Sequence, residues 1–125
     1  MEAVMRWLFV ILLVALPVPA GAQDCDEAET TLAMGVCLQD ALAAADAELN
    51  LTYRLAMEQL GENELPAVAT SLKQAQRAWI TYRDLACASE RALYAGGSMA
   101  GIARTGCLLR LTTERVTGLS EFLPN

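Results

Sequence analysis

Histidine is absent from this sequence of 125 residues. It is the most common general base near neutral pH and a frequent metal ligand, so the chain lacks the usual side chain for both roles. Neighbouring carboxylates could serve a glycosidase, but Asp26 with Glu29 and Glu62 with Glu64 lie in polar segments that we expect to be exposed. A general acid needs drier surroundings than such segments provide. The sequence therefore predicts a protein that is not an enzyme, with no catalytic residue, metal site or cofactor.

Basic residues are also scarce, since 9 lysines and arginines face 15 acidic residues and leave a net charge of −6. Proteins that bind nucleic acids draw much of their affinity from basic side chains that neutralise phosphates, so this charge argues against a nucleic-acid partner. An acidic surface suits a cationic protein partner. It suits equally well a protein whose charge only keeps it in solution.

The first residues have the features of a secretory signal peptide. Arg6 precedes ten residues without a charge or a breaker, Trp7 to Leu16, and two prolines and the small residues Ala20-Gly21-Ala22 follow. The apolar run is too short for a membrane-spanning helix, which takes about 20 residues. We expect cleavage of residues 1–22, which leaves residues 23–125 as a single domain without a membrane span, in the periplasm or secreted.

Apolar residues recur every three or four positions in three segments, which predicts three amphipathic helices and no strand. We expect these helices near residues 30–60, 63–94 and 98–122, with Thr30 or Thr31, Asn63 and Ser98 as N-terminal caps, Gly61 as a C-terminal cap and Pro66 in a first turn. Short connections between long helices favour antiparallel neighbours. The predicted fold is therefore all-α, a compact antiparallel three-helix (up-down-up) bundle.

Four cysteines follow the expected cleavage site, Cys25, Cys37, Cys87 and Cys107. An even number in a small exported chain predicts two disulfides that staple the bundle. If the first two helices are antiparallel neighbours, the start of the first lies beside the end of the second. That arrangement favours Cys25 with Cys87 and leaves Cys37 with Cys107. The alternative is Cys25 with Cys37 and Cys87 with Cys107.

The second helix has an apolar series that predicts its buried side: Leu65, Val68, Leu72, Ala75, Trp79, Tyr82 and Ala86. We expect Trp79 and Tyr82 in the core, together with Leu49 and Tyr53 of the first helix.

Polar side chains lie beside these apolar series, Asp46 and Asn50 on the first helix and Gln76 and Arg83 on the second. An unpaired buried charge is costly, so we expect Asp46 or Asn50 to meet Arg83, with Gln76 completing the network. The alternative is a polar cleft that binds a ligand.

The spacing Gln76-x-x-Trp79-x-x-x-Arg83-x-x-x-Cys87, followed by Gly96-Gly97-Ser98, is distinctive. The same pattern includes Thr30-Thr31, Met34, Cys37, Asp46, Leu49-Asn50, Tyr53, Tyr82, Asp84, Cys107, Thr113, Arg115 and Leu119. From Cys25 to about Phe122 the chain resembles the LprI-like lysozyme inhibitor family. It departs from the family at Gly35, where we would expect asparagine.

This resemblance implies a small exported domain of the bacterial envelope whose protein partner is a lysozyme. An acidic surface would steer it toward a cationic muramidase, and a projecting loop would block the carbohydrate cleft. Candidates for the loop are Gly96, Gly97 and Ser98, and candidates for the acidic surface are Asp26, Glu27, Glu29, Glu62 and Glu64. The alternative function is a non-inhibitory envelope module that binds another protein or stabilises an assembly.

Overall fold

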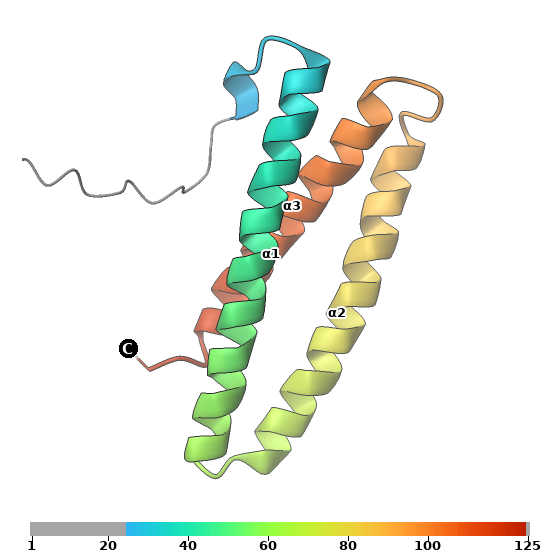
Figure 1. Cartoon of the computed structure of the whole chain (residues 1–125). Coiled ribbons are helices and arrows are strands. Elements are labelled where there is room, and N and C mark those ends of the chain that lie inside the picture. Colours follow the sequence, from blue (N-terminus) through green and yellow to red (C-terminus); the bar gives the residue numbers. More distant parts are fainter. Residues whose placement is uncertain (1–24, 125) are drawn as a thin grey trace, which may run out of the picture.

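The computed structural model describes residues 25–124 and consists of a short 3-10 helix followed by three long α-helices. The elements are η1 (Cys25–Glu27), α1 (Thr31–Glu62), α2 (Pro66–Ala92) and α3 (Met99–Ser120). Successive long helices run in opposite directions (Figure 1). The prediction of an all-α bundle of three helices with two disulfides is confirmed. The expected signal peptide lies outside the described residues.

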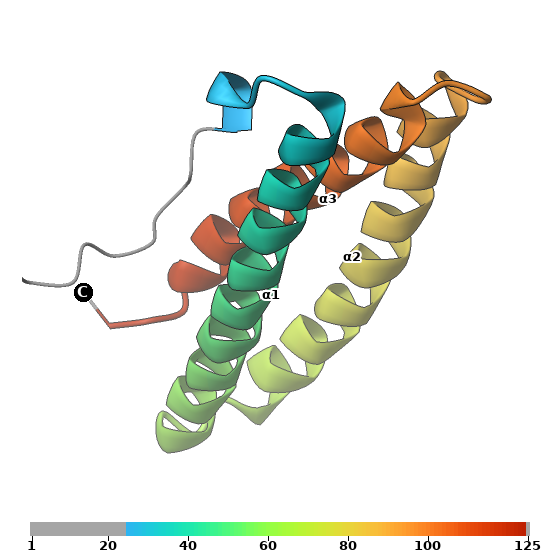
Figure 2. The same cartoon turned by 45° about the horizontal axis from the view of Figure 1, so that its top comes forward.

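The third helix holds the bundle together. It packs against both α1 and α2, whereas α1 and α2 contact each other far less. α1 and α2 are close at their connection and diverge toward the other end, while α3 crosses behind them (Figure 1 and Figure 2). We call that other end, with η1, the start of α1 and the α2–α3 loop, the disulfide end. None of the helices in residues 25–124 is long and apolar enough to cross a membrane.

The first helix begins as predicted and ends differently. The Thr30 hydroxyl oxygen accepts a hydrogen bond from the Ala33 amide at 3.1 Å, which caps the free amides of the first turn. At the other end the helix continues past Gly61, and Glu64 holds the left-handed position with φ of 55°. The amides of Leu65 and Glu64 donate to the carbonyls of Leu60 and Gly61, at 3.0 and 3.1 Å, and so close the helix end without a glycine at the turn.

The expected caps of the other two helices are wrong in part. Asn63 terminates α1 instead of capping α2, whose first turn contains Pro66 as predicted. Ser98 occupies the N-cap position of α3, but its side chain makes no capping hydrogen bond. Both helices therefore begin without a side-chain cap, and their stability depends on packing.

The core consists of two clusters of buried residues. The cluster nearer the α1–α2 connection contains Leu49, Ala56, Leu60, Leu72 and Leu119, with Tyr53 packed against it. The cluster at the disulfide end contains Cys87, Cys107, Leu108 and Leu111. The half-buried Trp79 packs against both clusters. This side chain therefore joins the two parts of the core.

The prediction that Tyr82 lies in the core is wrong, because its side chain is 59% exposed. Ala75 is also exposed, and the inward positions of the helix are taken by Gln76 and Arg83. The apolar series of α2 is thus offset from the side that faces the bundle. Polar residues can occupy that side because they find hydrogen-bond partners on the neighbouring helices.

The favoured disulfide pairing is also wrong. Cys25 bonds to Cys37 and Cys87 bonds to Cys107, with Cα atoms 5.7 and 5.4 Å apart. The favoured pairing assumed that the start of α1 lies beside the end of α2, but the two helices diverge there (Figure 1). The first part of α3 packs beside the end of α2 instead, which brings Cys107 to Cys87.

Candidate functional site

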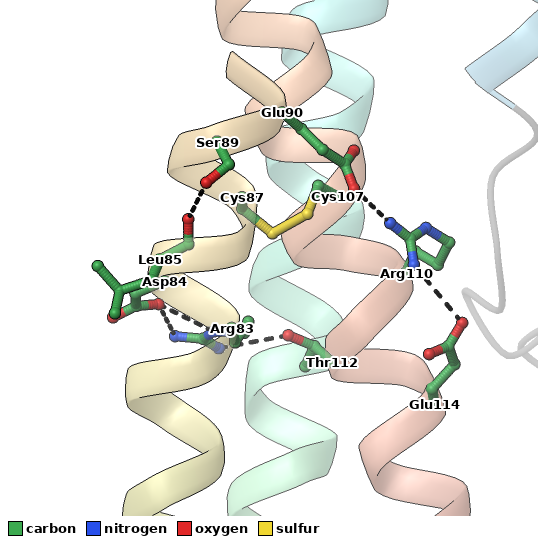
Figure 3. The surroundings of a disulfide bond; sticks show 10 residues. All are labelled: Arg83, Asp84, Leu85, Cys87, Ser89, Glu90, Cys107, Arg110, Thr112 and Glu114. Atoms are coloured by element: carbon green, nitrogen blue, oxygen red, sulfur yellow. Dashed lines mark hydrogen bonds and ion pairs between the residues drawn. A yellow bond between two sulfur atoms is a disulfide. The ribbon is translucent and has the colours of Figure 1, made fainter. Parts of the chain in front are cut away.

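Arg83 forms the centre of a network between all three helices. Its Nη1 atom lies 3.3 Å from Asp46 Oδ1 on α1 and donates to the Thr112 hydroxyl on α3, also at 3.3 Å. Its Nε and Nη2 atoms contact Asp84 Oδ1 at 3.1 and 3.0 Å (Figure 3). The Arg83 side chain is only 17% exposed. Its guanidinium group is therefore occupied by internal partners.

A second polar contact lies near Trp79. Arg115 on α3 donates from Nε to the Gln76 side-chain oxygen at 2.8 Å. The guanidinium carbons of Arg83 and Arg115 lie 5.1 and 6.0 Å from the centre of the Trp79 ring, within the range of cation–π attraction. The indole thus lies close to two cations that are both held by hydrogen bonds.

The structure brings only some of the predicted network residues together. Asp46 meets Arg83, whereas Asn50 is exposed and forms no part of the described network. Gln76 binds Arg115 instead of Arg83. Thr112 and Arg115 also belong to these contacts, although neither was predicted to do so. Arg115 belongs to the residue pattern shared with the family, and its spacing of four from Leu119 was the available signal.

One donor of the second contact stays unsatisfied. The Nη2 atom of Arg115 is buried and has no hydrogen-bond partner among the described residues. A buried donor without a partner costs about 1–3 kcal/mol. The contact therefore orients Trp79 and the α2–α3 pair, and adds less net stability than its geometry suggests.

The buried disulfide has a third polar contact beside it. Arg110 on α3 lies 2.7 Å from Glu90 on α2 and 3.9 Å from Glu114 on its own helix (Figure 3). These side chains are about half exposed, so the ion pairs are worth little individually. They lie at the rim of the α2–α3 contact, where the disulfide already fixes the two helices.

These polar groups favour a structural role over chemistry or ligand binding. The network residues are engaged with one another and join helices. No group of three or more cysteines, aspartates or glutamates among residues 25–124 could hold a metal ion. A partner-binding surface must therefore be sought among the exposed side chains.

Charge is unevenly divided between the two halves of the described chain. The first half, residues 25–65, contains nine acidic residues and one basic residue, Arg54. The second half, residues 66–124, contains four acidic and seven basic residues. The net charges are −8 and +3. Because η1 and α1 form the first half, the negative charge is concentrated on one helix and the segment before it.

The acidic candidates from the sequence lie at opposite ends of this helix. Asp26, Glu27 and Glu29 are exposed at the disulfide end, and Glu62 and Glu64 are exposed at the α1–α2 connection. A helix of 32 residues is about 48 Å long. The structure therefore does not gather these five residues into one site.

The glycine loop is a compact connection at the disulfide end. Residues 93–99 are all exposed, and Gly96 has φ of 80°, a conformation that favours glycine. Turn hydrogen bonds run through the loop, including Gly97 N to Tyr94 O at 3.0 Å and Ala100 N to Gly97 O at 3.3 Å. The side chains that project from it are apolar, since Leu93 is 81% exposed and Tyr94 49%.

A shallow hollow of about 400 Å³ lies beside the last turns of α1. It is lined by Leu55, Glu58, Gln59 and Glu62 of α1 and by Leu123 and Pro124 after α3. The lining combines the apolar side chains of Leu55, Leu123 and Pro124 with two carboxylates. Glu62 was among the predicted acidic residues and Glu58 was not, because nothing in the local pattern shows that the C-terminal tail lies beside α1.

The chain is similar in sequence to a protein family and to a bacterial relative. A family model described as "Lysozyme inhibitor LprI" matches residues 22–119. The chain is similar to an uncharacterized protein of Rhizobium meliloti (strain 1021), with 39% identity over 125 aligned positions that cover 90% of each chain. No solved structure matches the chain. The matched range contains all four cysteines and the residues of the Arg83 network.

Proposed function

The chain belongs to the lysozyme inhibitor LprI family, and from this premise we propose that it inhibits a cationic lysozyme-type muramidase through the acidic surface of its first half. It acts as a binding protein without chemistry of its own. We place this action in the periplasm or outside the cell, after removal of residues 1–22. Two disulfides suit such an oxidising compartment.

The observation that carries the proposal is the separation of charge. Among the nine acidic residues of the first half, Asp46 forms an ion pair with Arg83 of the second half. The other eight acidic residues of the first half are exposed. A surface of one sign accelerates encounter with a partner of the opposite sign and fixes its orientation.

The fold supplies a rigid support for this surface. α1 is a single helix from Thr31 to Glu62, and α3 packs along it. Carboxylates on a helix that is already ordered lose little further backbone freedom on binding, which favours affinity. Binding across the substrate cleft of the muramidase would exclude the cell-wall polysaccharide.

The glycine loop is a second candidate contact. It lies at the same end of the molecule as Asp26, Glu27 and Glu29 (Figure 1). Exposed Leu93 and Tyr94 could enter an apolar subsite, while the turn hydrogen bonds keep the loop short. The substitutions Leu93→Ser and Tyr94→Ser test this contribution separately from charge.

The proposal is tested by the rate at which a cationic lysozyme clears a cell-wall suspension. The chain from Gln23 onward, which contains every described element, is added at micromolar concentration. We expect the rate to fall as the protein is added, and the inhibition to weaken as salt rises from about 10 to 300 mM, because salt screens exposed charges.

An unchanged rate at micromolar protein and low salt would contradict inhibition of that muramidase. Direct binding without inhibition would favour the alternative function, an envelope module that binds a protein partner. Inhibition that does not respond to salt would leave the activity standing and remove the acidic surface as its cause.

A further inference from the structure

The outer side of α1 has a second regular stripe besides the one that faces the core. Glu48, Leu51, Leu55, Glu58 and Glu62 follow one another in steps of three and four residues, so they lie along one side of the helix. All five are exposed, with Leu51 at 45% and Leu55 at 40%. We call these five residues the acidic stripe.

The hollow lies at the C-terminal end of the acidic stripe. Leu55, Leu123 and Pro124 form its apolar part, and Glu58 and Glu62 stand beside them. The tail after α3 forms part of the lining, because Leu123 and Pro124 lie beside the last turns of α1 in this hollow. The site is thus built from two segments that are far apart in the sequence.

Its two carboxylates are not neutralised within the described chain. Glu58 and Glu62 lie four residues apart on one helix, where like charges repel and weaken the helix slightly. Neither side chain forms a hydrogen bond or an ion pair among residues 25–124. Arg54 precedes Glu58 by four residues but forms no ion pair with it in this part of the chain. A cation from outside would remove the repulsion.

From this geometry we infer that the hollow receives a lysine or arginine side chain from the cationic partner. The aliphatic stem would lie on Leu55, Leu123 and Pro124, and the charged head would bind Glu58 and Glu62. A bare metal ion does not suit the site, since only two carboxylates line it and no group of three metal-binding side chains occurs among residues 25–124. The identity of the partner rests on the proposed function, whereas the class of side chain rests on the hollow itself.

The test compares two pairs of substitutions that change the net charge equally. Glu58→Gln with Glu62→Gln removes the carboxylates of the hollow and keeps side-chain size. Glu114→Gln with Glu121→Gln removes two exposed carboxylates of the second half, outside the proposed acidic surface. If the hollow is the contact, the first pair weakens inhibition of the muramidase about tenfold at low salt and the second less than threefold. Equal losses, or no loss from the first pair, would overturn the inference while leaving the proposed function intact.

A second measurement does not depend on inhibition. N-acetyl-arginine methylamide is titrated into the unmodified protein, and its binding is followed through the backbone amide signals in NMR spectra. We expect shifts confined to Leu55, Glu58, Glu62 and Leu123, and their loss in the Glu58→Gln, Glu62→Gln variant. Such shifts in a protein that inhibits no muramidase would support the hollow and contradict the proposed function. Shifts at other residues, or no shifts, would contradict the hollow as the binding site for a basic side chain.

Discussion

The two halves of this chain use their charged residues differently. In residues 66–124, Arg83, Arg110 and Arg115 are all engaged inside or at the rim of the fold. In residues 25–65, Asp46 forms an ion pair with another helix, whereas Glu48, Glu58 and Glu62 of α1 are exposed. The disulfides of the two halves differ in burial. Cys87 and Cys107 are buried, whereas η1, which contains Cys25, has no buried residue.

This difference separates folding from recognition. Charges that join helices cannot be changed without loss of stability, whereas charges on the outside of α1 can be changed with little effect on the fold. The comparison can therefore be tested by substitutions that should be severe in the second half and mild at matched positions.

The largest effect is expected at Trp79. Trp79→Ala should lower the free energy of unfolding by about 4 kcal/mol, because the side chain joins both core clusters and stacks with two arginines. Tyr82→Ala on the same helix should change it by less than about 0.5 kcal/mol, since Tyr82 is 59% exposed. Urea unfolding followed by circular dichroism measures both. Equal losses would mean that Tyr82 packs in solution.

The second-largest loss of stability is expected at the Cys87–Cys107 disulfide, and removal of the Cys25–Cys37 disulfide should cost less. Replacing Cys87 and Cys107 by alanine should lower stability by about 3 kcal/mol, because this bond closes a 20-residue separation between two packed helices. Replacing Cys25 and Cys37 should lower it by less than about 1 kcal/mol. That bond closes a 12-residue separation in a segment without buried residues, which can open locally. A larger fall in the midpoint of thermal unfolding from loss of Cys25–Cys37 than from loss of Cys87–Cys107 would contradict this prediction.

A smaller effect than at Trp79 or at the buried disulfide is expected at the contact that crosses between the halves. Arg83→Ala should lower stability by about 1–2 kcal/mol, because it removes the contacts to Asp46, Thr112 and Trp79. Arg77→Ala, at an exposed position of the same helix, should change it by less than about 0.5 kcal/mol.

A double-mutant cycle with Asp46→Asn isolates the contribution of the ion pair. We expect a coupling of about 0.5–1 kcal/mol, because Asp46 is 46% exposed and water screens it. A coupling near zero would assign the Arg83 effect to Thr112 and Trp79 alone.

The architecture could be predicted from the sequence because apolar residues recur every three or four positions in each helix and helix-breaking residues separate the helices. The three-helix bundle follows from that pattern, and Thr30 and Pro66 begin their helices as expected. The register of α2 could not be predicted in the same way. Apolarity alone selects Tyr82 for the core, but Arg83 lies inside because three helices supply its partners.

Features that depend on the angle between helices were beyond the sequence pattern. The disulfide pairing follows from the divergence of α1 and α2, which no local spacing encodes. The hollow likewise requires the return of Leu123 and Pro124 to the end of α1. Two of the predicted acidic candidates, Glu62 and Glu64, lie at that end, while Glu58 becomes visible only in three dimensions.

Trp79 also gives the protein an intrinsic optical reporter. The chain has two tryptophans, and the other is Trp7, within the expected signal peptide. From Gln23 onward, indole emission therefore comes from one position, close to two guanidinium groups where the three helices meet. A change in that emission would report rearrangement of the helix junction, and its constancy during binding at the outer side of α1 would show that the partner meets a rigid surface.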